Sequence, residues 1–252
     1  MNQKTLVIVP TYNERENLPR LVQRIMGQPA PVDLLIVDGN SPDGTGQLAD
    51  QIAAKIPRVH VFHEKEKAGL GRAYCAAFQW ALQRDYEFIM EMDGDFSHNP
   101  DDIPRFLEMI KKEDGDLALG SRYRNGIRVI NWPLRRLMLS LCAAKYVQVI
   151  TGMPITDPTG GFKCFRRHTL QSINLEAVRS NGYSFQVELT HKVWRQRMKI
   201  VEIPIIFTDR YQGSSKISRK IVWEALWVVW QLWLQNGLRR SPRRPSIQPS
   251  RT

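Results

Sequence analysis

Short apolar runs rich in β-branched residues alternate with stretches of helical periodicity through the first half of this chain, and this alternation restricts the fold more than any other feature. Strands that alternate with helices favour an α/β fold, in which helices cover both faces of a mostly parallel sheet. With 252 residues, 42% of them hydrophobic, the chain can bury the core that such a domain needs. The predicted strands are Leu6–Val9, Leu34–Val37, Val59–Phe62 and Phe88–Met92.

Three of these strands end in polar or glycine-containing turns. The turns are Thr11–Glu14, Asp38–Gly44 and Asp93–His98. In open α/β sheets, ligands bind beyond the carboxyl ends of the strands. We therefore expect the three turns to converge on one crevice and to hold the functional site.

The second half of the chain is less regular. We expect a helix at Pro133–Ile150, a glycine-rich turn at Asp157–Phe162, a helix at Ser184–Met198 and a strand at Val201–Phe207. These elements are interpreted as the second half of the same domain, which we expect to span residues 1–216.

A tryptophan-rich segment follows this domain. The helix predicted at Ile217–Leu238 carries Trp223, Trp227, Trp230 and Trp233, and their spacing places them along one stripe. The segment is too short and too interrupted to span a membrane, which takes roughly 20 predominantly apolar residues. An amphipathic helix that lies at a membrane surface fits the pattern better, although the stripe would also suit packing against the domain core.

The net charge of +11 points to an anionic partner, and its distribution indicates which kind. Five arginines and no acidic residues lie in residues 239–252, a proline-broken tail that we expect to be disordered. A basic tail beside an apolar helix suits the anionic lipid of a membrane surface. The sequence contains no motif of a nucleic-acid-binding fold, so we predict no nucleic-acid partner.

Cysteine usage and the N-terminus bear on localisation. Cys75, Cys142 and Cys164 are odd in number and form no CxxC pair, so neither a disulfide framework nor a zinc site is indicated. The apolar run before Pro10 is only four residues long, much shorter than a signal-peptide core. We expect a cytoplasmic protein that lies peripherally on the cytoplasmic face of a membrane.

The Asp93-Gly94-Asp95 triplet directly follows an apolar strand. Its glycine removes side-chain bulk where a ligand or an ion must approach. Paired carboxylates bind hard divalent cations such as Mg²⁺ or Mn²⁺, which keep part of their coordination shell for substrate phosphates. A plain strand-end turn also commonly contains Asp-Gly, so the triplet taken alone leaves both interpretations open.

Eight motifs in a fixed order make the triplet specific. Together they resemble the dolichyl-phosphate or polyprenyl-phosphate mannosyltransferases, within the glycosyltransferase family 2 group of GT-A fold enzymes. The resemblance covers nearly the whole predicted domain and implies a single Rossmann-like GT-A domain. The motifs are Pro10–Leu18, Asp38–Gly46, Gly69–Ala73, Asp93–Pro100, Gly120–Tyr123, Asp157–Phe162, Gly182–Gln186 with Glu188, and Arg210–Lys216.

The resemblance implies a role for each matching residue. The implied catalytic residues are Asp95, Arg122 and Arg136, with the arginines facing the phosphates of donor and acceptor. The implied metal ligands are Asp93, Asp95 and Ser97. The implied nucleotide-sugar site contains Pro10, Tyr12, Glu14, Val37, Asp38, Gly39, Asp93, Gly94, Asp95, Arg122, Arg210 and Lys216.

The chain departs from the family pattern at Gly39. The family usually has a second consecutive aspartate at this position, which lies against the nucleotide base. Its absence removes an acceptor for the N–H groups of the base. The sequence leaves three explanations open: Asp38 or Asn40 compensates, base selectivity is relaxed, or activity is reduced.

The activity implied by the resemblance is transfer of mannose from GDP-mannose to a polyprenyl or dolichyl phosphate, with a divalent cation and with inversion at the sugar. Many relatives carry transmembrane helices or recruit small membrane subunits, so the resemblance also allows such subunits as partners. Two alternatives stay open. One is a polyprenyl-phosphate glucosyltransferase that uses UDP-glucose, and the other is a non-catalytic, membrane-associated nucleotide-sugar binder.

Overall fold

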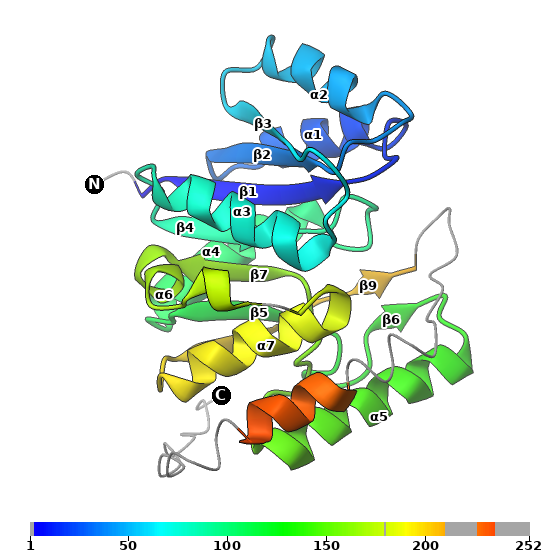
Figure 1. Ribbon diagram of the computed structural model, residues 1–252, viewed down its shortest axis with the longest axis vertical. Coiled ribbons are helices and arrows are strands. Elements are labelled where there is room, and N and C mark those ends of the chain that lie inside the picture. The colour runs from blue at the N-terminus through cyan, green and yellow to red at the C-terminus, as the bar shows by residue number, and fades with distance from the viewer. Residues whose placement is uncertain (1–2, 179, 210–225, 235–252) are drawn as a thin grey trace.

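The computed structural model describes residues 3–178, 180–209 and 226–234, and it shows an α/β domain built on a seven-stranded sheet (Figure 1). The strand order is β3-β2-β1-β4-β7-β5-β8. Neighbouring strands are parallel, except that β7 runs antiparallel to both β4 and β5. The strands are β1 (Thr5–Thr11), β2 (Val32–Asp38), β3 (Val59–His63), β4 (Phe88–Glu91), β5 (Leu117–Ser121), β7 (Lys163–Arg166) and β8 (Ile200–Pro204).

The predicted mostly parallel sheet is confirmed, and the four predicted strands of the first half are β1 to β4. The single strand predicted at Val201–Phe207 is wrong in part, because β8 ends at Pro204. The chain then forms β9 (Phe207–Thr208), which pairs with β6 (Val129–Ile130) in a separate two-stranded sheet. Strand β7 gave no apolar run in the sequence because a lysine and an arginine occupy its two ends.

Helices cover both faces of the large sheet. Leu6 and Ile8 of β1 belong to one core cluster, which includes side chains of α3 and α7, whereas Val7 and Val9 belong to another, which includes side chains of α1 and α4. Strands buried on both faces read as continuous apolar runs, which is why the sequence revealed them. The helices are α1 (Leu18–Met26), α2 (Thr45–Ala53), α3 (Leu70–Leu82), α4 (Ile103–Lys112), α5 (Leu134–Thr151), α6 (Arg167–Gln171) and α7 (Gly182–Arg195), with short 3₁₀ turns η1 (Pro100–Asp102) and η2 (Leu175–Ala177).

The helix at residues 226–234 lies along α5 beneath the domain (Figure 1). It packs through Val229 and Leu232, which join a third core cluster with Val147 of α5. Trp227, Trp230 and Trp233 of the tryptophan stripe are exposed by 63%, 43% and 44%, so this part of the stripe faces away from the core. The fourth stripe residue, Trp223, lies outside the described residues.

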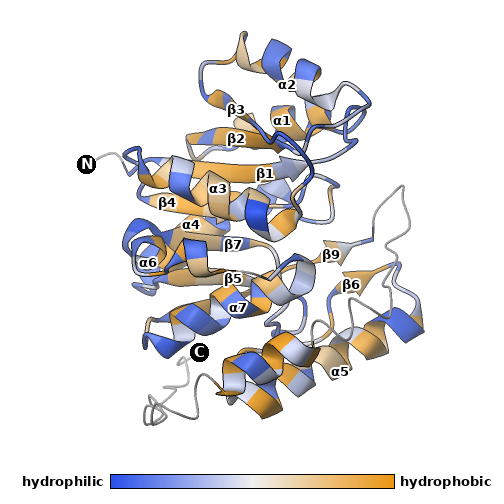
Figure 2. Cartoon of the chain, viewed as in Figure 1, coloured by the Kyte–Doolittle hydropathy of each residue, from blue (hydrophilic) through white to orange (hydrophobic). Residues whose placement is uncertain are grey.

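Helix α5 adds to this exposed apolar surface. Leu134, Met138, Leu139 and Val149 are exposed on it, and Figure 2 shows hydrophobic residues along both α5 and the 226–234 helix. None of the helices in the described ranges is long and apolar enough to cross a membrane.

Candidate active site

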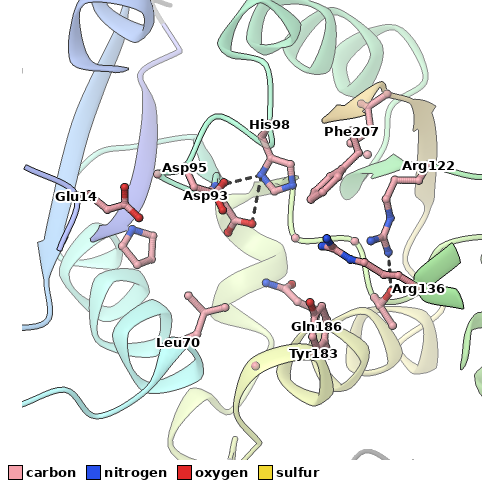
Figure 3. A pocket seen from close by; sticks show the side chains of 18 residues that line it. Glu14, Leu70, Asp93, Asp95, His98, Arg122, Arg136, Tyr183, Gln186 and Phe207 are labelled. Carbon is pink, nitrogen blue, oxygen red and sulfur yellow. Dashed lines mark hydrogen bonds and ion pairs between the residues drawn. The ribbon is translucent and has the colours of Figure 1, made fainter. Parts of the chain in front are cut away.

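A polar cavity of about 320 Å³ opens at the carboxyl ends of β1, β4 and β5. Figure 3 shows the carboxylates of Glu14, Asp93 and Asp95 on one side and the guanidinium groups of Arg122 and Arg136 on the other. Its remaining lining residues are Pro10, Leu70, Gly94, His98, Gly120, Thr159, Gly160, Gly161, Gly182, Tyr183, Gln186, Ile205 and Phe207.

The loop after β4 fixes the two aspartates. The Ser97 backbone N–H donates to Asp95 Oδ1 at 3.0 Å, and the Asp93 N–H donates to His98 Nδ1 at 3.1 Å. His98 is only 2% exposed, and burial lowers its pKa even though Asp93 and Asp95 act to raise it. The imidazole is therefore neutral, with its proton on Nε2, and it supports the loop without neutralising the carboxylates.

The donor set fits a hard divalent cation. Asp93 and Asp95 both line the cavity, and Gly94 between them packs closely on β1, because an added Cβ would lie 3.3 Å from Val9 Cγ1. Within the described ranges, no group of three His, Cys, Asp or Glu side chains forms a complete metal site. Two carboxylates leave coordination positions for water and for the oxygens of a diphosphate, as Mg²⁺ and Mn²⁺ require.

Ser97, the third metal ligand expected from the sequence, does not line the cavity. Its side chain is buried, and its hydroxyl has no hydrogen-bond partner among the residues that the structure describes. Its observed contact is the backbone bond to Asp95. The role of Ser97 as a metal ligand stays a prediction.

Arg122 is held in a buried ion pair. Its Nε and Nη2 donate to Asp157 at 2.7 and 2.6 Å, and Nη2 also donates to Thr159 Oγ1 at 2.7 Å. Burial alone would lower the pKa of Arg122, but the charge and hydrogen bonds of Asp157 raise it above its ordinary value. The pair keeps a fixed positive charge in the cavity wall while tying most of the guanidinium to protein groups.

Arg136 reaches the same wall from the start of α5. Its Nη1 lies 2.6 Å from Asp209 Oδ1, and its guanidinium stacks 4.1 Å from the ring centre of Trp132. The side chain is less buried than that of Arg122. Arg136 is therefore the better placed of the two to meet an incoming anion. Arg210 and Lys216, also expected in the nucleotide-sugar site, lie outside the described residues.

The turn after β2 lies next to the cavity, but none of its residues is among the lining residues, so its part in the expected crevice stays a prediction. Asp38 is buried and accepts from the Ser41 N–H at 3.1 Å and from Ser41 Oγ at 2.6 Å, which closes the turn. The turn is joined to the β1 turn by the bond from the Asn13 N–H to Ser41 Oγ at 3.1 Å. Tyr12, Val37 and Gly39 likewise fall outside the cavity lining.

A second group of residues, Tyr12, Gly39, Glu64 and Lys67, is here called the niche and lies at the ends of β1, β2 and β3. The Lys67 ammonium lies 3.5 Å from the ring centre of Tyr12. A Cβ added at Gly39 would lie 3.6 Å from both Tyr12 Cδ2 and Glu64 Oε2, which is ordinary contact distance. The carboxylate beside Gly39 thus comes from Glu64, a residue that the motifs did not single out. Whether Tyr12, Val37, Asp38 and Gly39 bind nucleotide stays a prediction.

A second cavity of about 300 Å³ adjoins the polar one and is mostly apolar. It lies between α5, the start of α7 and the 226–234 helix, with Ala143, Val147, Val187 and Val229 among its lining residues. The two cavities share four residues of one wall, namely Arg122, Arg136, Thr159 and Tyr183.

The structure also adds residues that the sequence did not assign to the site. These residues are His98, Thr159, Tyr183 and Gln186. All four lie within the quoted motifs, which therefore pointed to the correct segments, but the spacing within a motif does not show which of its residues face the cavity. A side chain at Gly160 would meet the Gly120 carbonyl oxygen at 2.6 Å, which explains the need for glycine where this loop crosses the end of β5.

Comparison with known proteins bears on the class of this site. The family profile described as Glycosyl transferase family 2 matches residues 6–173. Polyprenol monophosphomannose synthase of Mycolicibacterium smegmatis is 47% identical over 240 residues, which are 95% of this chain and 90% of that protein. Undecaprenyl-phosphate mannosyltransferase of Micrococcus luteus is 45% identical over 223 residues, which are 88% of this chain and 91% of that protein.

Solved structures share the fold at low sequence identity. Glucosyl-3-phosphoglycerate synthase from Mycobacterium tuberculosis superposes with a TM-score of 0.65 at 16% identity, covering 95% of this chain and 82% of that one. A mannosyltransferase from Pyrobaculum calidifontis in complex with GDP-Man and Mn²⁺ gives a TM-score of 0.58 at 16% identity, covering 95% of this chain and 76% of that one. The GT-A architecture expected from the sequence is thereby confirmed.

Proposed function

The chain belongs to glycosyl transferase family 2, and on this premise we propose that it transfers mannose from GDP-mannose to a polyprenyl phosphate, giving polyprenyl-phosphate mannose and GDP. Two relatives that match almost their whole length carry names that combine mannose transfer with a polyprenyl or undecaprenyl phosphate. As a member of this enzyme family the chain is a glycosyltransferase, which argues against the non-catalytic nucleotide-sugar binder.

The observation that carries the proposal is the shared wall between the two cavities. The polar cavity contains Asp93 and Asp95, and the apolar cavity lies beyond Arg122, Arg136, Thr159 and Tyr183. A lipid phosphate has a dianionic head on an isoprenoid chain. Its head would meet the arginines while its first isoprene units are buried among aliphatic side chains, which favours binding through removal of apolar surface from water.

The chemistry needs little proton transfer. A phosphate monoester has a second pKa of about 6, so the acceptor is already largely ionised near pH 7 and needs no strong general base. Its oxygen bonds to the sugar C1 as the bond from C1 to the diphosphate oxygen breaks, and the electron pair leaves with GDP. The barrier therefore comes mainly from bringing two anions together, which cationic side chains in a water-poor site lower.

Each wall of the polar cavity has its part in this reaction. Mg²⁺ or Mn²⁺ bound to Asp93 and Asp95 would neutralise the departing diphosphate. On the opposite side, Arg136 would orient the acceptor phosphate, with Asp209 and Trp132 holding its guanidinium in place. Arg122, fixed by Asp157, would add a permanent positive charge behind it.

A membrane-facing position is part of the proposal. Trp227, Trp230 and Trp233 are exposed beside the apolar cavity, together with the exposed apolar residues of α5. Tryptophan favours the headgroup region of a bilayer. A protein seated on a membrane by this surface would draw its lipid acceptor directly into the apolar cavity.

Transfer assays test the proposal. The protein is incubated with radiolabelled GDP-mannose or UDP-glucose, a polyprenyl phosphate, and Mg²⁺, Mn²⁺ or a chelator, and lipid-extractable label is counted. We expect label in lipid from GDP-mannose alone, and its loss with the chelator. Label transferred only from UDP-glucose would replace the proposed donor by that of the glucosyltransferase alternative.

A further inference from the structure

A half-buried carboxylate, that of Glu64, lies at the niche beside the polar cavity. Glu64 follows β3, and its backbone N–H donates to the Asp38 carbonyl at 2.9 Å, which ties it to the end of β2. Its side chain is half-buried, yet it makes no side-chain hydrogen bond or ion pair within the described part of the chain. Burial raises the pKa of this carboxyl, and the nearby charge of Asp38 raises it further. Such a group gains from N–H donors that a ligand brings.

The backbone beside Glu64 carries no side chain of its own at Gly39. The nearest atoms to a Cβ there are Glu64 Oε2, Thr11 O and Tyr12 Cδ2, all at 3.6 Å. The Tyr12 ring has a cation, Lys67, 3.5 Å from its centre. An aromatic ring, a carboxylate and a stretch of backbone without a side chain thus meet at one point, which is a combination that suits a planar heterocycle with N–H groups.

The other polar side chains of this turn already form hydrogen bonds within the protein. Asp38 accepts the Ser41 hydroxyl and backbone N–H, and the Asn40 side chain donates to the Lys65 carbonyl at 3.2 Å. Neither is therefore placed to replace a carboxylate at position 39. Glu64 is the acidic group among the described residues whose oxygen approaches that position most directly.

The niche lies at the correct end of the sheet for the base of the donor. Thr11 and Tyr12 directly follow Pro10, which lines the cavity of Asp93 and Asp95, and strands β1, β2 and β3 are neighbours in the sheet. A nucleotide with its diphosphate at the aspartates would extend along these strand ends. This step rests on the proposed function.

We propose that Glu64 reads the base of the donor nucleotide, its carboxylate accepting hydrogen bonds from base N–H groups across Gly39. Guanine presents two adjacent donors, N1–H and the N2 amino group, and a carboxylate accepts both at once. Uracil presents one, N3–H, between two carbonyl oxygens that a carboxylate repels. Glu64 therefore selects GDP over UDP.

Titration of nucleotides against Glu64→Gln tests this role. The affinities of GDP, IDP and UDP are measured by calorimetry with Mg²⁺, and inorganic pyrophosphate serves as a ligand without a base. We expect Glu64→Gln to weaken GDP about 10-fold or more, the usual scale for a lost charge-assisted bond, and to leave pyrophosphate unchanged. Because IDP lacks the N2 amino group, the wild-type preference for GDP over IDP should shrink in the variant. Glu66→Gln, an exposed glutamate two residues away, is the matched control.

A carboxylate swap gives a second, independent test. Gly39 has no positive φ, and a Cβ there meets only ordinary contacts, so aspartate fits this position. Glu64→Ala should lose the preference for GDP over UDP, and Glu64→Ala/Gly39→Asp should regain it. Recovery by the double variant excludes misfolding as the cause of the loss in Glu64→Ala.

Two results would overturn the role of Glu64. One is a GDP-to-UDP affinity ratio unchanged by Glu64→Gln, and the other is an equal loss of nucleotide and pyrophosphate binding. Failure of the proposed function looks different: the wild-type protein would bind GDP with a preference that depends on Glu64, yet it would transfer no label from GDP-mannose to polyprenyl phosphate.

Discussion

At the scale of single residues, the charged groups of the polar cavity fall into two kinds. Asp93 and Asp95 both line the cavity, and Asp95 accepts a hydrogen bond from the Ser97 N–H of its own loop. Arg122 instead forms a buried ion pair with Asp157. The charge of Asp93 or Asp95 can be removed by substitution without disturbing the core, whereas removal of one charge of the buried pair disturbs it.

Replacement of Asp95 by asparagine should therefore remove activity and keep the fold. The amide oxygen can still accept from the Ser97 N–H, while the charge that holds a divalent cation is lost. We expect transfer to fall by roughly 100-fold or more, the scale of one missing electrostatic group in an active site. Radiometric transfer and thermal unfolding are measured together, with Asp114→Asn, a highly exposed aspartate, as control. Metal-dependent turnover near the wild-type rate in Asp95→Asn would remove this residue from the site.

Replacement of Arg122 by methionine should destabilise the protein. Asp157 would be left buried without its cation, which typically costs about 3–5 kcal/mol. The free energy of unfolding is measured by denaturant titration. A change of less than about 1 kcal/mol would show that the buried pair contributes little.

Two further variants separate structure from catalysis here. Arg122→Met/Asp157→Leu removes both charges and should recover much of the lost stability without recovering activity. Arg136→Met disrupts a more exposed ion pair, with Asp209, so it should lower activity much more than stability.

At the scale of elements, α5 and the 226–234 helix form a pair with one covered and one uncovered side. Val147 and Val229 pack inward, while Leu134, Trp227 and Trp230 are exposed. The Tyr146 hydroxyl donates to the Leu226 carbonyl at 3.3 Å, which adds a polar tie between the two helices. The same pair encloses the apolar cavity, so the proposed lipid site and the exposed apolar surface belong to one substructure.

Removal of the tryptophan surface should weaken membrane association. Simultaneous replacement of Trp227, Trp230 and Trp233 by serine should reduce partitioning onto vesicles of mixed neutral and anionic lipid by roughly 10-fold or more, because it removes the indole rings that would bind at the membrane interface. Sedimentation with vesicles measures this. Leu232→Ala is the control from the packed side of the helix, and it should lower stability with little change in partitioning. Equal partitioning of the triple variant and the wild type would place membrane contact elsewhere.

At the scale of the whole molecule, buried titratable groups make stability depend on pH. Glu91 and Lys163 face each other in register across β4 and β7, with 3.9 Å between Lys163 Nζ and Glu91 Oε2. Burial raises the pKa of Glu91 to about 7, although Lys163 acts to lower it. Lys163 also donates to the Gln186 carbonyl at 3.1 Å, which links this pair to a residue of the polar cavity.

His191 on α7 gives a sharper pH prediction. Burial lowers its pKa to about 4, and Arg195 and Lys192 lower it further. Below its unfolded pKa of 6.5 the unfolded chain binds a proton that the folded protein excludes, so stability falls as pH drops from 6.5 towards 4. Between pH 7 and pH 5 this residue should cost about 2 kcal/mol. Denaturant unfolding at both pH values measures the difference.

His191→Gln isolates this contribution. Between pH 7 and pH 5 the variant should lose about 2 kcal/mol less stability than the wild type, while other groups titrate as before. His98 is a second buried histidine with a lowered pKa, so some acid sensitivity should persist in the variant. An unchanged difference between pH 7 and pH 5 in His191→Gln would mean that His191 is accessible to protons in the folded state.

The sequence by itself determined the elements whose signal is local. Strands β1, β2 and β4 are visible because both of their faces are buried, so most residues in each run are apolar. The Asp93–Asp95 triplet is visible because it directly follows β4, and the ordered motifs gave the family that comparison confirmed. Helices α5 and α7 were found with their ends displaced by one to three residues, since helix ends depend on local capping.

Only the tertiary structure decided what depends on distant segments meeting. Strand β7 is held between β4 and β5 by pairing, not by its own apolar content. The ion pair of Arg122 with Asp157, the apolar cavity behind it, and the approach of Glu64 to Gly39 each join segments about 25 to 100 residues apart. No local sequence pattern predicts such contacts, because they arise from the order of strands in the sheet and from the packing of one segment against another.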